Sequence, residues 1–350
     1  MIKILAVALF NDPTRQGGVE SFNRVLKSFY PQNLRFIIFN LKKETESLYK
    51  VNDITKVGSL NFIFRIINKI LKNKLRNFLL IKKVREIRPD FLIFSSPYEI
   101  NVLHKIKAKK IFVQHTSLEE YKRSYLYSRK NEKMLKEIPN YFIFLSSYDK
   151  DTFCKKLKLD ENKARVIRHS CKIELLKSKK KKSKKLIMIT RIDNEQKRID
   201  LAIKLMKKLS NYTLDIYGDG PDMKECKKLI EAEKVSNVFL RGSTNKVQEK
   251  LDESGIFIMT SDYEGYPIAL IEAMRRGLPL VIRNTFDSAR DIVVDNGILL
   301  ESVWNEEKYI EAIKEVYKNY EYYSENSKKL GERHNSEIIK QKWDKLFVKI

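Results

Sequence analysis

The chain has 350 residues, of which 43% are hydrophobic, and it carries 17 tyrosines and 18 phenylalanines. This composition excludes a disordered protein, and the length is enough for two domains of ordinary size. Three cysteines, without metal-ligand spacing, indicate a reducing compartment rather than a disulfide framework. No run of about 18 uncharged apolar residues predicts a transmembrane helix. The first residues are expected to form a strand rather than a signal peptide.

The net charge of +25 lies entirely in the first half of the chain. Residues 1–184 hold 42 Lys and Arg against 17 Asp and Glu, whereas residues 185–350 hold 28 of each sign. A general lysine bias would spread evenly along the chain. The asymmetry therefore predicts an anionic partner for the first half, which could be a membrane surface, an acidic substrate or nucleic acid.

Short apolar runs alternate with amphipathic stretches along the first half. The stretches "GVESFNRVLKSFY" and "KLRNFLLIKKVREIR" have the apolar spacing of helices. The apolar runs predict buried strands at residues 3–10, 34–41, 90–96, 109–115 and 140–147. This alternation is typical of βαβ units that form a parallel sheet.

A basic run, "KSKKKKSKK" at residues 177–185, interrupts this pattern. Its composition predicts a solvated linker between two domains, with a membrane or nucleic-acid contact as the alternative. After it, strands are predicted at residues 185–192, 212–220, 237–242 and 255–261, with helices between them. The tail from residue 306 onward has helical spacing. The chain is therefore expected to contain two α/β units.

Glycines follow two of the predicted strands, at the strand ends where α/β sheets bind ligands. Gly17 and Gly18 open a helix whose free N–H groups could face an anion or a sugar hydroxyl, or they could simply permit a turn. Gly218 and Gly220 could let a base or ribose approach the backbone closely. This second signal is weak, because such turns are common in α/β folds.

Two cations flank the turn after the first strand of the second unit. Arg191 and Lys197 lie six residues apart in "MITRIDNEQKRID". A diphosphate needs both charge neutralisation and directed donors, and this pair could supply them. The alternative is two solvated surface cations.

The stretch "SDYEGYPIALIEAM" carries two glutamates, Glu264 and Glu272, seven residues apart. Gly265 and Pro267 predict a turn, followed by a helix from about Ile268. A carboxylate in so apolar a helix is costly unless it is hydrogen-bonded, and a ribose diol offers it two donors. The glutamate in the turn could accept from sugar hydroxyls, while the helix start could hold phosphate. The alternative is an ordinary helix with one capping and one solvent-facing glutamate.

Taken together, these motifs resemble the retaining glycosyltransferases of the GT4 family, which have the GT-B fold. The resemblance rests on "EGYPIALIEAMRRGLPLV", on "TRIDNEQKRID" and "LDIYGDGP" before it, and on "DIVVDNGILL" after it. In the first half it rests only on the glycine loop and the strand pattern. It implies an α/β fold with two Rossmann-like, doubly wound domains facing a central cleft.

The resemblance also sets the expected domain boundaries. Residues 1–176 would form the acceptor-side domain, and residues 186–334 would form the domain that binds the nucleotide sugar. The linker would occupy residues 177–185 between them. A helix at residues 335–350 would cross back to the N-terminal domain.

The resemblance implies a role for each site residue of the second half. Glu272 would bind the ribose hydroxyls of the sugar nucleotide, and Glu264 would face the donor sugar. Arg191 and Lys197 would neutralise the diphosphate. The backbone from Gly265 through Tyr266 to Pro267 would help to stabilise the leaving group, and Gly218 and Gly220 would also line the nucleotide-sugar site.

In the first half, Gly17 and Gly18 would approach the diphosphate or the acceptor. His115, in "VQHTS" at a strand end, matches a histidine near the donor sugar in many relatives; it could instead be hydrogen-bonded within its own loop. Glu264, Arg191, Lys197 and His115 are thus the predicted catalytic residues.

Two stretches depart from the family pattern. The stretch "ARVIRHSCKI" stands where relatives usually have an Asn-Gly pair, so the corresponding contact is in doubt. Arg198 replaces the glycine that often follows the lysine of the phosphate loop. This arginine could add a third cation or be solvated.

By resemblance, the enzyme would move a hexose or N-acetylhexosamine from a nucleotide sugar, with UDP favoured, to a glycan or lipid-linked acceptor. Such enzymes build cell-surface polysaccharides such as capsule or lipopolysaccharide, at the cytoplasmic face of the cell membrane. Neither cofactor nor metal is expected, because two cations can balance the diphosphate charge. The alternatives are a nucleic-acid or membrane-surface binding protein on this scaffold, or a sugar-nucleotide epimerase of the same fold.

The stretch at residues 59–88 has apolar residues at helical spacing, with Lys and Arg in much of the remainder. A basic amphipathic helix can lie on an anionic bilayer. The same helix could instead pack its apolar stripe on the sheet and leave a solvated basic face. The stretch therefore predicts peripheral membrane association without excluding a purely structural helix.

Overall fold

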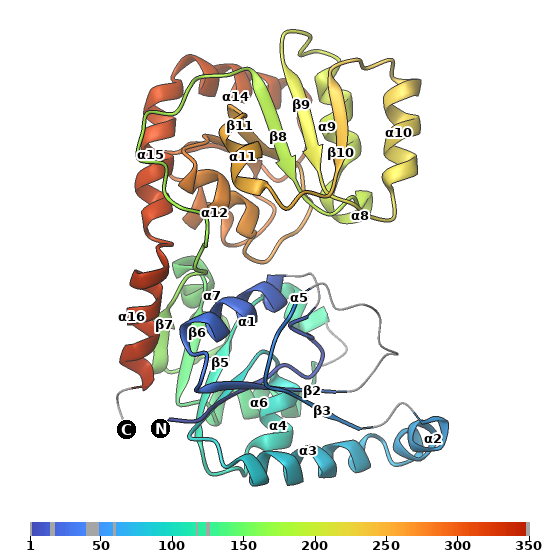
Figure 1. The fold of residues 1–350 in the computed structure, drawn as a ribbon, viewed down its shortest axis with the longest axis vertical. Helices are drawn as coiled ribbons and strands as arrows, with labels where there is room; N and C mark the ends of the chain where they lie inside the picture. Colours follow the sequence, from blue (N-terminus) through green and yellow to red (C-terminus); the bar gives the residue numbers. More distant parts are fainter. Residues whose placement is uncertain are drawn as a thin grey trace. The chain divides into compact units, whose positions relative to one another are not determined.

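The computed structural model describes residues 2–14, 18–39, 49–58, 61–116, 118–123 and 127–347. The chain divides into two compact units, each built around its own sheet (Figure 1). Unit 1 comprises Met1–Ile167 and Lys340–Ile350, and unit 2 comprises Arg168–Ile339. Among the described residues, no helix is both long enough and apolar enough to span a bilayer.

The sheet of unit 1 has seven parallel strands in the order β3-β2-β1-β4-β5-β6-β7. The five strands predicted from apolar runs are confirmed as β1 (Ile4–Val7), β2 (Leu34–Phe39), β4 (Phe91–Phe94), β5 (Lys109–Val113) and β6 (Tyr141–Phe144). The edge strands β3 (Ile54–Val57) and β7 (Ala164–Val166) were not predicted, because each is short and only partly buried.

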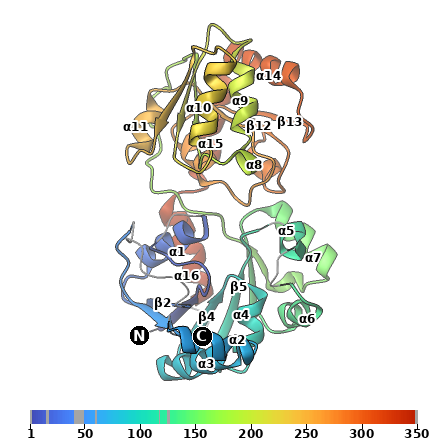
Figure 2. The same ribbon diagram turned by 90° about the vertical axis from the view of Figure 1, so that its right-hand side faces the viewer.

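Helices connect the strands of unit 1 and pack against its sheet (Figure 2). They are α1 (Gly18–Phe29), α2 (Phe62–Ile70), α3 (Lys74–Ile87), α4 (Pro97–Leu103), α5 (Leu118–Arg123), α6 (Arg129–Glu137) and α7 (Ser147–Leu157), with a 3-10 turn at Glu161–Lys163. The stretch at residues 59–88 is not one helix. It breaks after α2, where Lys72 and Asn73 adopt left-handed backbone conformations with φ of 46° and 67°.

The sheet of unit 2 has six parallel strands in the order β10-β9-β8-β11-β12-β13. They are β8 (Lys185–Ile189), β9 (Thr213–Tyr217), β10 (Val238–Gly242), β11 (Ile256–Met259), β12 (Leu280–Arg283) and β13 (Gly297–Leu300). Every strand predicted in this half is confirmed. The central strands β8 and β11 are continuous apolar runs of the kind that parallel sheets bury on both faces, whereas residues of the edge strand β10 are alternately exposed.

The helices of unit 2 follow its strands in the same alternation. They are α8 (Asn194–Lys197), α9 (Ile199–Met206), α10 (Met223–Ala232), α11 (Val247–Asp252), α12 (Ile268–Arg275), α13 (Ala289–Ile292), α14 (Glu306–Lys318), α15 (Tyr320–Glu332) and α16 (Ser336–Phe347). Tyr309 of α14 is fully buried, and its hydroxyl donates to the Val281 carbonyl of β12 at 2.7 Å. This helix is therefore fixed to the sheet by a hydrogen bond as well as by packing.

The basic run at residues 177–185 is largely exposed, as predicted, but it does not lie between the two units. It belongs to unit 2, whose boundary with unit 1 falls after Ile167 rather than after residue 176. Lys180 is buried, and its ammonium donates to the carbonyls of Leu251 and Asp252 at 2.7 Å each. Burial lowers the pKa of Lys180 to about 8. The run is held because a buried lysine caps the carbonyl end of α11.

The last helix, α16, passes from unit 2 into unit 1 at Lys340, so the part that packs on unit 1 begins later than residue 335. Trp343 and Phe347 are buried, and the Phe347 ring lies edge-on to Phe91 at 4.9 Å between centroids. Burying a phenylalanine in this way contributes about 1.5–3 kcal/mol. The C-terminal segment is thus part of the core of unit 1.

Candidate active site

The strand order of unit 2 reverses at β8, which lies between β9 and β11. At such a reversal, the loops beyond the carboxyl ends of the strands diverge, and α/β sheets bind ligands there. The loop after β8 leads into residues 193–198, here called the lysine turn, and β11 leads into residues 260–267, here called the glutamate loop. The predicted cations and carboxylates therefore come to the same edge of one sheet.

Lys197 and Glu264 form a single ion pair. The Lys197 ammonium donates to both carboxylate oxygens of Glu264, at 2.7 and 2.8 Å. The two side chains are only 14% and 8% exposed. Ser261 Oγ also donates to Glu264, at 2.7 Å. From the sequence, these residues were expected to contact different parts of a ligand, whereas in the structure they contact each other. The ammonium still has one of its three N–H groups available for another acceptor.

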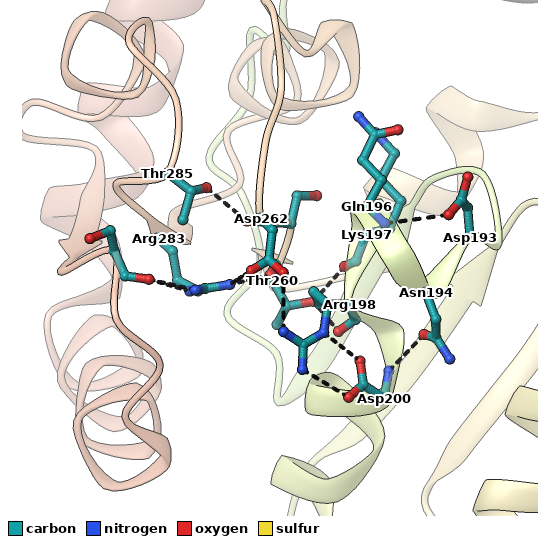
Figure 3. A network of polar contacts seen from close by, with 12 residues as sticks. Asp193, Asn194, Gln196, Lys197, Arg198, Asp200, Thr260, Asp262, Arg283 and Thr285 are labelled. Atoms are coloured by element: carbon teal, nitrogen blue, oxygen red, sulfur yellow. Dashed lines mark hydrogen bonds and ion pairs between the residues drawn. The ribbon is translucent and has the colours of Figure 1, made fainter. Parts of the chain in front are cut away.

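Backbone hydrogen bonds tie the lysine turn to the glutamate loop (Figure 3). The Asp262 N–H donates to the Gln196 carbonyl at 2.8 Å. The Thr260 hydroxyl lies 3.0 Å from the Lys197 carbonyl and 2.8 Å from the Arg198 carbonyl. These contacts fix the backbone on both sides of the ion pair.

Arg191 is the most exposed of the predicted cations, at 59% of its side chain. Its guanidinium donates to the Asp193 carboxylate, at the first residue of the lysine turn. Asp193 also caps α8, because its carboxylate accepts from the Gln196 N–H at 3.3 Å. Arg191 thus pairs with the first residue of the lysine turn and Lys197 with Glu264, so the two cations do not form one cluster of unpaired charge.

Glu272 differs from Glu264 in having no hydrogen bond or ion pair with any described residue. It lies on α12 between the buried side chains of Ile271 and Ala273, and it is itself half-buried. Burial raises the pKa of Glu272 to about 7. An unpaired carboxylate in such a place can accept two hydroxyl hydrogens without displacing an existing partner.

Gly218 and Gly220 are required by the chain itself. A Cβ at Gly218 would lie 1.7 Å from the Thr190 carbonyl oxygen, and a Cβ at Gly220 would lie 2.2 Å from that of Ile192. Gly218 also has φ of +140°. The loops after β8 and β9 therefore pack backbone against backbone, and this contact explains both glycines without a ligand.

The remaining predicted residues of the glutamate loop have structural contacts as well. The Gly265 carbonyl accepts from Ser288 Oγ at 2.7 Å, and Pro267 directly precedes α12, whose first N–H groups have no side-chain cap. The Tyr266 ring is buried against His169 and His334, with centroids 5.6 and 6.0 Å apart.

Comparison with known proteins relates the second half of the chain to a known family. Residues 174–334 match the family described as "Glycosyl transferases group 1". The second half of this chain is therefore similar to a group 1 glycosyltransferase domain. The poly(glycerol-phosphate) alpha-glucosyltransferase of Bacillus subtilis is 31% identical over 169 residues, which are 45% of this chain and 25% of that protein. The matched segments span 25% to 41% of the lengths of the first curated relatives.

Solved structures extend the likeness to the whole chain. The lipopolysaccharide outer core galactosyltransferase WaaB superposes with a TM-score of 0.77 at 18% identity, covering 100% of both chains. The pneumococcal O-GlcNAc transferase GtfA, in complex with UDP and GlcNAc, has a TM-score of 0.75 at 14% identity, covering 99% of this chain and 98% of that one. The GT-B fold and the resemblance to GT4-like glycosyltransferases are thereby confirmed.

The predicted site residues of unit 1 lie outside the glycosyltransferase domain. Gly17 lies outside the described residues. Gly18 begins α1, and a Cβ there would meet nothing within 4 Å. His115 follows β5, and its ring lies edge-on to Phe22 at 4.8 Å between centroids. Their proposed contacts with diphosphate or sugar remain predictions.

Sequence reasoning missed the residues that hold the lysine turn and the glutamate loop in place. Arg198, whose side chain is 31% exposed, pairs through its guanidinium with Asp200 and Asp262. Arg283, at the end of β12, pairs with Asp262 as well. The arginine in place of a glycine at position 198 was the signal that could have revealed this network of the glycosyltransferase domain.

Proposed function

We propose that this protein is a retaining glycosyltransferase that moves a hexose or N-acetylhexosamine from a nucleotide sugar to a glycan or lipid-linked acceptor. One observation carries the proposal. Glu264 of the glutamate loop is paired with Lys197, and the next helix, α12, carries the half-buried, unpaired carboxylate of Glu272, all within the residues that match the group 1 family. Such an arrangement offers an acceptor for ribose hydroxyls and a donor for a phosphate oxygen.

UDP is the favoured nucleotide of the donor. Support comes from a relative with the same fold, the pneumococcal O-GlcNAc transferase, whose structure contains UDP and GlcNAc. Glu272 would accept from the two ribose hydroxyls, and the third N–H of Lys197 would donate to the diphosphate. Arg191, which is mostly exposed and bound to Asp193, would turn from that carboxylate to the diphosphate when the donor arrives.

The chemistry follows from where charge develops. The bond between the anomeric carbon and the diphosphate oxygen breaks, a bond to the acceptor oxygen forms, and the acceptor proton passes to the departing diphosphate. Retention requires the acceptor to attack from the face of the leaving group. Lys197 and Arg191 stabilise the growing negative charge of the diphosphate, and Glu264 stabilises positive charge at the sugar. We propose that these groups serve without metal or cofactor.

Cell-surface polysaccharide synthesis is the proposed pathway, because the names of the relatives given above refer to poly(glycerol-phosphate) and to the lipopolysaccharide outer core. The acceptor and the linkage would be set by unit 1, which lies outside the residues that match the family model.

Turnover of a panel of UDP- and GDP-sugars tests the proposal, with release of the nucleoside diphosphate as the readout, in the presence and absence of EDTA. Glu272→Ala should abolish nucleotide binding and turnover. Glu311→Ala is the matched control, because Glu311 is an exposed glutamate within a helix of the same unit. A wild-type protein that binds none of the nucleotides, or a Glu272→Ala variant that keeps full turnover, contradicts the proposal.

We further propose that α2 holds the protein on an anionic membrane surface, at the cytoplasmic face of the cell membrane. Ile63 and Ile70 are 64% and 71% exposed, and Ile66, Ile67, Leu71 and Phe78 are exposed as well. No acidic residue occurs between Asn61 and Arg85, whereas eight Lys and Arg residues do. Exposed apolar side chains on a basic helix suit the interface of an anionic bilayer, where each cation contributes about 1 kcal/mol.

A second basic feature lies at the far end of α3. A cavity of about 920 Å³ is lined by Arg85, Arg88, Lys105 and Lys107, with Asp90 among its lining residues. These four cations make no ion pair with a described residue. The cavity therefore adds to the attraction of unit 1 for an anionic surface.

Sedimentation with liposomes tests the membrane proposal. The protein should bind phosphatidylglycerol vesicles but not phosphatidylcholine vesicles, and binding should weaken as salt is raised. Ile63→Ser with Ile70→Ser should reduce binding, whereas Val303→Ser, at another exposed apolar position, should not. Equal binding by all variants, or tighter binding to single-stranded DNA than to anionic vesicles, contradicts this role of α2.

A further inference from the structure

Arg198 has a backbone conformation that usually belongs to glycine. It stands between α8 and α9 with φ and ψ of 49° each, in the left-handed region. Its side chain compensates by forming two ion pairs. Nε and Nη2 donate to the two carboxylate oxygens of Asp200 at 3.0 and 3.1 Å, and Nη1 donates to Asp262 Oδ2 at 3.1 Å. One guanidinium thus bridges the start of α9 and the glutamate loop.

Asp262 is held from its other side by Arg283. Figure 3 shows its carboxylate between the two guanidinium groups, and Arg283 Nη1 donates to Asp262 Oδ1 at 2.6 Å. Arg283 is buried and also donates to the Thr260 carbonyl at 2.9 Å. Burial pushes the pKa of Asp262 upward, but the hydrogen bonds from Arg283 and Arg198 outweigh burial and lower it. We call Arg198, Asp262 and Arg283 the arginine clamp.

Two residues of the arginine clamp are close in sequence to the two members of the Lys197–Glu264 pair. Arg198 directly follows Lys197, and Asp262 precedes Glu264 by two residues. The backbone of Asp262 also donates to Gln196 within the lysine turn. Any movement that carries Asp262 away from Arg198 would therefore carry Glu264 away from Lys197. A glycine at position 198 would adopt the same backbone without strain, but it would supply neither ion pair.

We propose that Arg198 is a positioning residue, which holds the lysine turn against the glutamate loop so that Lys197 and Glu264 meet a ligand in one fixed arrangement. Its catalytic consequence rests on the proposed function, whereas the mechanical link does not. The clamp makes the site preorganised, because the donors need not be gathered at the moment when charge develops on the leaving group.

Arg198→Gly separates this role from simple folding. Glycine relieves the left-handed strain, so the melting temperature should stay close to that of the wild type. Backbone amides of residues 260–265 should nevertheless exchange hydrogen about tenfold faster, because the loop opens locally. With the nucleotide sugar turned over by the wild type, kcat should fall about tenfold while KM for the donor changes less than about threefold.

Two further variants complete the test. Arg198→Lys should recover only part of kcat, because one ammonium cannot bridge two carboxylates as a planar guanidinium does. Arg241→Ala is the matched control: Arg241 Nε donates to Asp215 at 2.8 Å in the same unit, away from the lysine turn. This control should leave kcat and the exchange of residues 260–265 unchanged.

The outcomes separate the clamp from the proposed function. Unchanged exchange at residues 260–265 in Arg198→Gly overturns the proposal, as does faster exchange with an unchanged kcat, or an equal loss in Arg241→Ala. If the wild type turns over no nucleotide sugar, the proposed function fails, and the exchange of residues 260–265 alone then decides whether the clamp exists.

Discussion

The glutamate loop of unit 2 and helix α2 of unit 1 place their side chains in opposite ways. In the glutamate loop, charged groups are drawn inward and paired: Glu264 is 8% exposed, and its carboxylate accepts from Lys197 and Ser261. In α2, apolar groups are turned outward, and the polar Asn68 is buried while Ile63 and Ile70 are exposed. Both arrangements are costly for a protein alone in water.

These costs indicate two different kinds of missing partner. A buried ion pair fixes geometry more than it adds stability, which suits a site that must hold charges ready for a small ligand. An exposed apolar stripe gains free energy only when something covers it, which suits a surface. The comparison therefore supports two separate proposals, a small anionic ligand for unit 2 and an extended anionic surface for unit 1.

The largest expected effect comes from breaking the ion pair in unit 2. Lys197→Met keeps the apolar stem but leaves Glu264 buried without a cation, which should lower the free energy of unfolding by about 3 kcal/mol. Adding Glu264→Gln should restore more than half of that loss. Turnover should fall about 100- to 1000-fold in Lys197→Met, because a donor to the leaving group is lost.

Urea unfolding and nucleotide release measure these two quantities. Lys207→Met is the control, because Lys207 pairs with Glu233 at 3.1 Å on the surface, with 61% of the lysine side chain exposed. That pair should contribute less than about 0.5 kcal/mol. A Lys197→Met variant as stable as the control would show that the pair is open to water.

A smaller effect on the free energy of unfolding is expected from the titration of Glu272. Its pKa of about 7 lies above the ordinary value of 4.5. Between these two values, the unfolded chain loses the proton while the folded protein keeps it. The free energy of unfolding should therefore fall as the pH rises from 4.5 to 7, and this contribution should be fully lost above 7. Glu272→Gln removes that dependence, so its stability advantage over the wild type should be larger at pH 8 than at pH 5.

Binding should respond to pH in the opposite direction. A ribose diol donates two hydrogens and therefore needs the ionised carboxylate, so the affinity of the wild type for a nucleotide should rise as the pH passes through 7. Urea unfolding and nucleotide titration at both pH values measure the two trends. The same stability difference at pH 5 and pH 8 would show that Glu272 is ionised and solvated throughout.

The sequence predicted most of the two sheets, because a parallel strand buried on both faces is a continuous apolar run. It did not predict β3, whose sequence "ITKV" is short and half-exposed, or the break in residues 59–88. Lysine has no preference for the left-handed region, so Lys72 gives no sign of the break in the sequence. Lys180 was taken as solvated, because one buried lysine within a run of lysines leaves no local signal.

The sequence predicted which residues belong to the candidate site, but not which of them form an ion pair with one another. Spacing identified Glu264, Glu272, Arg191 and Lys197 as site residues, but Lys197 and Glu264 are 67 residues apart, and only the folded sheet brings them together. The predicted glycines of the two units also turned out to differ in a way that their sequence context does not reveal. Gly218 is required by the Thr190 carbonyl, whereas none of the described residues comes close enough to require a glycine at Gly18. Sequence alone cannot separate a glycine kept for packing from one kept for a ligand.

The smallest effect on stability is expected from substitutions of exposed residues on α2. Ile63→Ser with Ile70→Ser should change the free energy of unfolding by less than about 0.5 kcal/mol, because both side chains are already in water. Ile100→Ala, at a fully buried isoleucine of α4 in the same unit, should cost about 2–5 kcal/mol. Urea unfolding without lipid measures both. If the α2 variant lost as much stability as the buried one, α2 would already be covered in solution, by a second copy of the chain rather than by a membrane, and the concentration dependence of unfolding would reveal that copy.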